Sequence, residues 1–180
     1  MPALSELISD EYREQLELMR KPNHRPMWGN GGQRHVTAVR EIAERIGASS
    51  ILDYGCGHGK LLEELAKVAA PVVRLHGYDP GIPERAALPE PADLVVSTDV
   101  LEHIEPDKLV GCLTHIKFLT GKAAYINVHT LAANARLPDG RNAHLIQKPA
   151  EWWQETLRGY FKTVERIKGF EGHRPSFLCE

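Results

Sequence analysis

The chain has 180 residues, the size of one domain, and 42% of them are hydrophobic, which is enough for a core. Its composition excludes collagen, coiled coils and intrinsic disorder. The net charge of -2 gives no positive field for nucleic acid and favours a small or neutral substrate. Scattered cysteines (Cys56, Cys112, Cys179), no signal-peptide pattern and only short apolar runs predict a cytoplasmic protein without a membrane partner.

Hydrophobic periodicity predicts helices and strands that alternate along most of the chain. Helices are expected over 4–20, 36–46, 60–70, 106–119 and 149–160. Strands are expected over 50–54, 72–78, 93–97, 123–129, 163–169 and 176–179. Because the last two strands are joined by a short turn, the pattern predicts an α/β fold with a mostly parallel sheet and an antiparallel edge strand.

A glycine-rich turn follows the first predicted strand, with the sequence Asp53-Tyr54-Gly55-Cys56-Gly57-His58-Gly59. Ligands of parallel sheets bind at the carboxyl ends of strands, and glycines let a ligand approach the backbone closely. Asp79 ends the second predicted strand, where a carboxylate can accept hydrogen bonds from both hydroxyls of a ribose. The spacing is G-x-G-x-G rather than the G-x-G-x-x-G of dinucleotide sites, which argues against a nicotinamide-dependent oxidoreductase.

These residues resemble class I S-adenosylmethionine-dependent methyltransferases. The matching segments are 51–59, 77–80, 92–96 and 100–104. The resemblance implies a three-layer Rossmann-like core over residues 36–180, with residues 1–35 as an N-terminal helix and a candidate lid, all in one domain over 1–180. It also implies S-adenosylmethionine as cofactor, with Asp53 near its amino group and Asp79 on its ribose. The cofactor-binding residues expected from it are Asp53, Gly55, Cys56, Gly57, Gly59, Asp79, Pro80, Thr98 and Asp99.

One segment departs from the pattern of this family. Only thirteen residues separate Asp79 from Asp93, and four of them are prolines. The family normally has a helix and a further edge strand here, and proline interrupts both. We therefore expect this edge strand to be missing, which leaves the adenine contact unassigned, with Leu88, Ser97 and Thr98 as candidate neighbours.

The segment after the third strand, residues 98–103, faces the transferred methyl group in the family layout. Alignment of donor and acceptor is the main task of the protein, and a base is needed only if the acceptor holds its proton, as an alcohol does. His103, His129 and Asp99 are the predicted catalytic residues, and His144 is a further candidate base because histidine titrates near neutrality. A structural role is the alternative for each of them.

A divalent metal is a second hypothesis for the same segment. Asp99, Glu102 and His103 resemble the Glu-x-x-Glu-His element of metal-dependent methyltransferases that act on ribose 2′-hydroxyls of small RNAs. The resemblance implies a site formed by Asp99, Glu102, His103 and His144. Asp99 is shorter than the glutamate it replaces, and a purely structural role is the competing interpretation.

The acceptor is expected to be a hydroxyl or an amine of a small molecule or sugar. Residues 97–100 read Ser-Thr-Asp-Val and lack the Asn/Asp-Pro-Pro-aromatic run of enzymes that methylate base amino groups. An RNA or protein acceptor stays open, as does a non-catalytic module with a degenerate cofactor site.

Residues 21–35 combine glycines and basic side chains with Met27 and Trp28, and they form either a lid or a loop packed on the core. The oligomeric state is undetermined.

Overall fold

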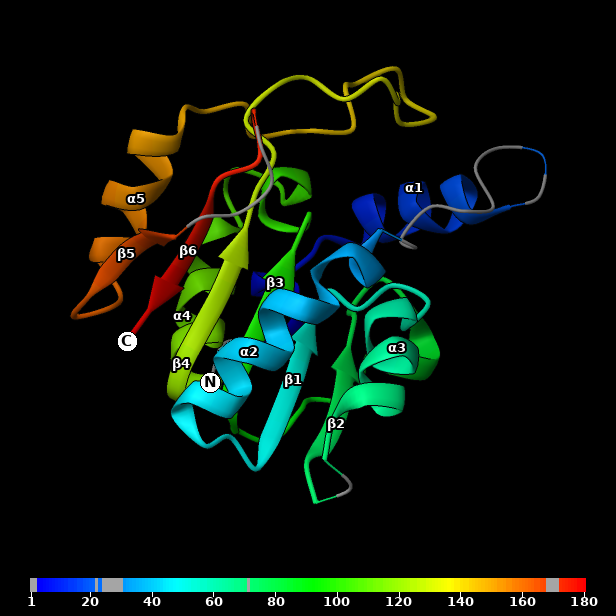
Figure 1. Ribbon diagram of the computed structural model, residues 1–180. Coiled ribbons are helices and arrows are strands. Elements are labelled where there is room, and N and C mark those ends of the chain that lie inside the picture. Colours follow the sequence, from blue (N-terminus) through cyan, green and yellow to red (C-terminus); the bar gives the residue numbers. More distant parts are fainter. Residues whose placement is uncertain (1–2, 22, 24–30, 71, 168–171) are drawn as a thin grey trace.

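The computed structural model describes residues 3–21, 23, 31–70, 72–167 and 172–180, and it has a six-stranded sheet at its centre (Figure 1). The strands lie in the order β2-β1-β3-β4-β6-β5. Their bounds are β1 (Ser50–Tyr54), β2 (Arg74–Tyr78), β3 (Ala92–Thr98), β4 (Thr120–Asn127), β5 (Val164–Ile167) and β6 (Ser176–Cys179). Strands β1 to β4 pair in parallel, so their carboxyl ends meet at one edge of the sheet.

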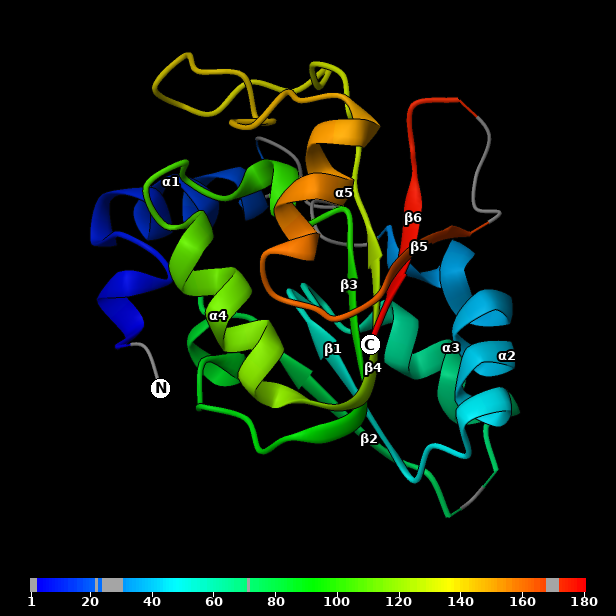
Figure 2. The same cartoon turned by 90° about the vertical axis from the view of Figure 1, so that its left-hand side faces the viewer.

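Helices cover both faces of the sheet, which confirms the predicted three-layer α/β fold. The α-helices are α1 (Asp10–Arg20), α2 (Val36–Ile46), α3 (Lys60–Val68), α4 (Leu109–Leu119) and α5 (Ala150–Arg158). Figure 2 shows α2 and α3 on one side of the sheet and α4 and α5 on the other. Successive strand residues face opposite sides, so Ile51 packs with α2 and α3 whereas Leu52 joins the cluster under α4 and α5. No helix in the described part of the chain is long and apolar enough to cross a membrane.

The C-terminal hairpin forms as predicted, but its antiparallel strand is not at the edge. Strand β6 pairs antiparallel with both β4 and β5, so β5 is the edge strand. Strand β6 is buried along its whole length, whereas β5 has exposed positions. The more apolar segment, Ser176–Cys179, therefore takes the inner place, because an inner strand is covered on both faces by helices.

The sheet ends at β2 on the opposite side, as the short proline-rich segment predicted. Residues 80–92 lie entirely within the described part of the chain and contain one 3-10 turn of three residues, Pro83–Arg85, and no strand or α-helix before β3 begins at Ala92. Strand β2 is therefore an edge strand.

The first predicted helix, over 4–20, is divided in two. A 3-10 turn, Leu4–Glu6, precedes α1, and Ser9 caps α1 by accepting a hydrogen bond from the Tyr12 backbone N–H at 3.0 Å. Helix α1 lies beyond the carboxyl ends of the strands, a position on which Figures 1 and 2 agree. The sequence pattern identified the helix but not its place over this edge.

Candidate active site

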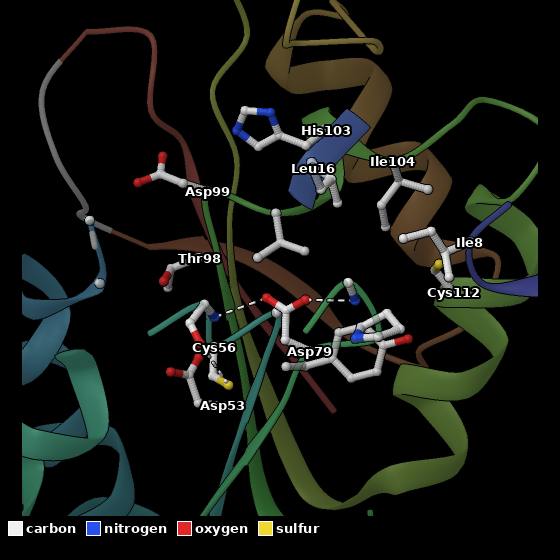
Figure 3. A pocket seen from close by; sticks show the side chains of 18 of the residues that line it. Ile8, Leu16, Asp53, Cys56, Asp79, Thr98, Asp99, His103, Ile104 and Cys112 are labelled. Carbon is white, nitrogen blue, oxygen red and sulfur yellow. Dashed lines mark hydrogen bonds between the residues drawn. The ribbon is translucent and has the colours of Figure 1, made fainter. Parts of the chain in front are cut away.

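A cavity of about 320 Å³ opens at the carboxyl ends of β1, β2 and β3. Figure 3 shows Asp79 near its centre, Asp99 and His103 toward one end, and Ile8, Ile104 and Cys112 toward the other. The predicted cofactor residues that line it are Asp53, Gly55, Cys56, Gly57, Asp79, Pro80, Thr98 and Asp99. The topology thus brings residues from three strand ends and from α1 into one pocket.

The glycine turn forms one wall of the cavity and depends on glycine for steric reasons. Gly55 has φ 81° and Gly57 has φ 51°, a left-handed region that other residues rarely adopt. A Cβ atom on Gly55 would lie 2.5 Å from a methyl carbon of Val100. Gly59 lies outside the lining and forms the N-cap position of α3. The turn therefore presents bare backbone to the cavity.

Asp79 is buried and has a fixed carboxylate. Its Oδ2 accepts a hydrogen bond from the Gly57 N–H at 3.0 Å, and its Oδ1 accepts one from the Gly81 N–H at 2.9 Å (Figure 3). An ionised carboxylate offers about four acceptor positions, so about two are left for ligand hydroxyls. This geometry suits the two hydroxyls of a ribose.

Asp53 is buried at the end of β1 and lines the same cavity. Burial, and then the negative charge of Asp79, raise the pKa of Asp53 to about 7. A cationic ligand group beside Asp53 would offset the cost of ionising this buried carboxyl, because an opposite charge favours the carboxylate. The site is thus poised for an ammonium group.

Cys56 also faces the cavity, but it is not a nucleophile. Burial, helped by the charges of Asp53 and Asp79, raises the pKa of its thiol to about 12. At neutral pH the side chain is a neutral thiol, which is poorly reactive. The thiol instead accepts a hydrogen bond from Arg85 Nη1 at 3.8 Å and donates one to the Gly57 carbonyl at 3.7 Å.

A cluster of imidazoles and one carboxylate lies at the end of the cavity that Asp99 and His103 line, here called the acceptor end. The rings of His103 and His144 are 4.7 Å apart, those of His129 and His144 are 4.9 Å apart, and His103 and His144 line the cavity. His129 lies outside the lining, and its backbone N–H donates to Glu102 Oε1 at 2.9 Å. Glu102 Oε2 is buried without a hydrogen-bond partner among the described residues.

The imidazoles in this cluster are neutral at physiological pH. Burial, and then the proximity of His144, lower the pKa of His103 to about 4, and burial lowers the pKa of His144 and His129. His103 Nδ1 donates to the Ala143 carbonyl at 2.7 Å, so the ring carries its lone pair on Nε2. Burial raises the pKa of Glu102 to about 8.

Three of the four predicted metal ligands come together. Glu102, His103 and His144 each offer a ligand atom, and these atoms lie within 4.8 Å of one another. Asp99 is outside this group of three. It adopts φ 53° and forms ion pairs with Arg34 and Arg174, which tie the segment before α2 and the segment before β6 to the end of β3.

Several lining residues were not identified from the sequence. They include Arg20, Lys60, Glu105, Cys112, Arg174 and the apolar side chains of the N-terminal segment, and no local motif marks them. Of the candidate adenine neighbours, Thr98 lines the cavity, Ser97 is buried outside the lining, and Leu88 is exposed. The lid residues Met27 and Trp28 lie outside the described residues.

The fold and this site together define a class I S-adenosylmethionine-dependent methyltransferase. A family profile described as a methyltransferase domain matches residues 8–169, and the chain belongs to that family. Membership of this class argues against a nicotinamide-dependent oxidoreductase, and it supports S-adenosylmethionine as the cofactor.

Known proteins agree with this assignment. The chain is 29% identical over 166 residues to the ubiquinone biosynthesis O-methyltransferase of Xylella fastidiosa (strain M23), covering 74% of this chain and 67% of that protein. It superposes with a TM-score of 0.63 and 14% identity on Burkholderia thailandensis 1,6-didemethyltoxoflavin-N1-methyltransferase, covering 99% of this chain and 89% of that one. The methyltransferase domain of bacterial CtHen1 superposes with a TM-score of 0.62 and 16% identity, and the match covers 82% of this chain and 97% of that one.

Proposed function

We propose that this methyltransferase transfers the methyl group to a hydroxyl of a small molecule. The observation that carries the proposal is the cluster of neutral imidazoles, His103 and His144, which lines the same cavity as the glycine turn. A hydroxyl must lose its proton during the reaction, and a neutral imidazole can accept it. The name of the Xylella relative, an O-methyltransferase, supports the same reaction class.

The residues of the chain divide the task between the two ends of the cavity. The glycine turn and Asp53 hold the amino-acid end of the cofactor, and Asp79 holds the ribose. When bound, the cofactor supplies a methyl carbon that accepts an electron pair from the acceptor oxygen while its bond to sulfur breaks. Most of the rate comes from alignment of the reacting groups and from exclusion of water.

His103 is the proposed base. Its Nδ1–H donates to the Ala143 carbonyl, so the lone pair of the ring lies on Nε2, the atom that would accept the proton. His144 lies next to it and positions the acceptor hydroxyl. His129 donates its backbone N–H to Glu102, and its side chain does not line the cavity. Asp99 orients Arg34 and Arg174, whose guanidinium groups line the acceptor end of the cavity.

A divalent metal is the second proposal for the same cluster. One carboxylate and two imidazoles are a suitable donor set, and the buried, unpartnered Oε2 of Glu102 is the type of atom that a cation would stabilise. Glu102, His103 and His144 would hold the ion. A bound metal would supply Lewis-acid activation of the acceptor oxygen.

Isotope-labelled S-adenosylmethionine and a panel of small phenols and sugars test the acceptor class. A structured RNA and a peptide mixture serve as the alternatives. We expect methylation of a hydroxyl compound, with His103→Gln lowering kcat by about 10²–10⁴-fold. His129→Gln is the matched control and should lower kcat by no more than about threefold, since its ring lies outside the cavity. Label in the RNA or peptide fraction alone would refute the proposal.

A chelator distinguishes the two roles of the cluster. Full activity in excess chelator supports His103 as the base, whereas loss of activity that a divalent cation restores supports the metal. We also propose that residues 1–180 act as one methyltransferase domain, with 1–35 as an N-terminal helix and candidate lid and 36–180 as the Rossmann-like core, and that the protein works in the cytoplasm. Three buried free cysteines support a reducing compartment.

A further inference from the structure

The apolar end of the cavity lies on the far side of Asp79 from Thr98 and Asp99 (Figure 3). Ile8, Ile104 and Cys112 line this end, and Leu16, which belongs to the same apolar cluster as Ile8, lines the cavity between His103 and Ile104 in this view. Burial raises the pKa of the Cys112 thiol to about 12, so this end carries no charge from it. A flat apolar group fits such a lining better than a charged one.

The covalent structure of the cofactor relates this end to the purine. In an adenosyl compound the amino-acid chain leaves the ribose at one carbon, and the adenine leaves it at another on the opposite side of the ring oxygen. With the amino-acid end at the glycine turn and the ribose hydroxyls on Asp79, the adenine projects away from the turn. It then enters the apolar end of the cavity.

The carboxyl-terminal part of α1 contacts the segment that follows Asp79 at this edge of the sheet. Strand β2 is the edge strand, and the short segment after Asp79 has no element that covers a ligand. The carboxyl-terminal part of α1 lies there instead. A Cβ atom on Gly81 would be 3.0 Å from Leu16 Cδ1, and Arg20 Nη1 donates to the Gly81 carbonyl at 2.6 Å.

The position of α1 is fixed from both ends. At its start, the backbone N–H and hydroxyl of Ser9 donate to the carboxylate of Glu105 at 2.9 and 2.6 Å, and the Tyr12 hydroxyl donates to the His103 carbonyl at 2.6 Å. At its end, Arg20 Nη2 lies 3.7 Å from Asp79 Oδ1. These contacts join the helix to His103 and Glu105 at its start and to Asp79 at its end.

We propose that α1 forms the adenine-binding wall of the cofactor site, with Leu16 packing on the purine and Ile8 beside it. The inference rests on the proposed placement of the cofactor on Asp53 and Asp79. It assigns a specificity role to an N-terminal helix, and it explains how the chain binds an adenosyl group with a trimmed sheet.

Fragments of the cofactor test this assignment. S-adenosylhomocysteine contains the amino-acid chain, the ribose and the adenine, whereas 5′-methylthioadenosine contains only the adenine and the ribose. Leu16→Ala should weaken binding of both ligands by about tenfold in calorimetry, which corresponds to about 1.4 kcal/mol. Asp53→Asn should weaken S-adenosylhomocysteine and leave 5′-methylthioadenosine unchanged. Leu18→Ala, on the same helix but outside the lining, is the matched control and should change neither affinity.

Hydrogen exchange on the unmodified protein gives a second measurement that does not depend on folding of the variants. We expect 5′-methylthioadenosine to slow exchange of the amides in 10–20, and free homocysteine to leave them unchanged. Equal affinity of Leu16→Ala and wild type for 5′-methylthioadenosine, or unchanged exchange in 10–20 while it binds, would overturn the inference. A wild-type protein that binds neither adenosyl ligand would refute the proposed cofactor site itself.

Discussion

Cofactor binding should release a proton from Asp53. The pKa of this buried carboxyl is raised to about 7 in the free protein, so about half of the molecules carry the proton at pH 7. The ammonium group of the cofactor favours the carboxylate and drives the proton off. We therefore expect about 0.5 proton to be released for each S-adenosylhomocysteine bound at pH 7, and an affinity about tenfold lower at pH 6 than at pH 8.

Calorimetry in buffers of different ionisation enthalpy measures this release directly. Asp53→Asn has no proton to lose, so its binding should be weaker and should not change between pH 6 and pH 8. Equal proton release by wild type and variant would show that another group titrates and would refute the assignment of Asp53.

The raised pKa of Asp53 also predicts how the unfolding free energy of the cofactor-free protein changes with pH. Because the folded pKa is above the ordinary value of 3.8, the contribution of Asp53 to stability is fully present below about pH 4 and is lost as the pH rises through 7. The rise of the pKa from 3.8 to about 7 corresponds to a loss of about 4 kcal/mol in the free energy of unfolding, since one pKa unit is worth about 1.4 kcal/mol. Urea unfolding should therefore find Asp53→Asn more stable than wild type at pH 8 by a few kcal/mol, and nearly equal to it at pH 4. A constant difference across this range would contradict the burial argument.

Three further substitutions test the architecture of the site. Gly55→Ala places a methyl against Val100 at a left-handed φ and should lower the unfolding free energy by about 1–3 kcal/mol, with partial recovery when Val100→Ala is added; full stability in the single variant would refute the steric argument. Asp79→Asn should weaken S-adenosylhomocysteine by about tenfold or more in calorimetry, because a charged acceptor is lost, and an unchanged affinity would place the ribose elsewhere. Ser9→Ala removes the cap of α1 and the hydroxyl bond to Glu105 while keeping the backbone N–H bond to it, and it should cost about 1–2 kcal/mol by thermal unfolding, whereas no change would show that α1 is held by other contacts.

Short-range signals in the sequence were sufficient for most of the fold and for half of the site. The alternation of periodic segments predicted the strands and helices, and the turn from Asp53 to Gly59 predicted residues that line the cavity, because these features depend on neighbouring residues. The thirteen residues after Asp79 likewise predicted the missing strand, since neither a strand nor a helix fits a short segment with four prolines.

Contacts between distant segments were decided only by the tertiary structure. The inner place of β6, the crossing of α1 over the cavity and the pairing of Asp99 with Arg34 and Arg174 join residues that are far apart in the chain. Burial likewise set the pKa of Asp53, Glu102 and His103, which depends on how much water the packed chain excludes. The sequence by itself determined which chemical groups the protein carries. Only folding determined which of them face one cavity, because that depends on packing across the whole sheet.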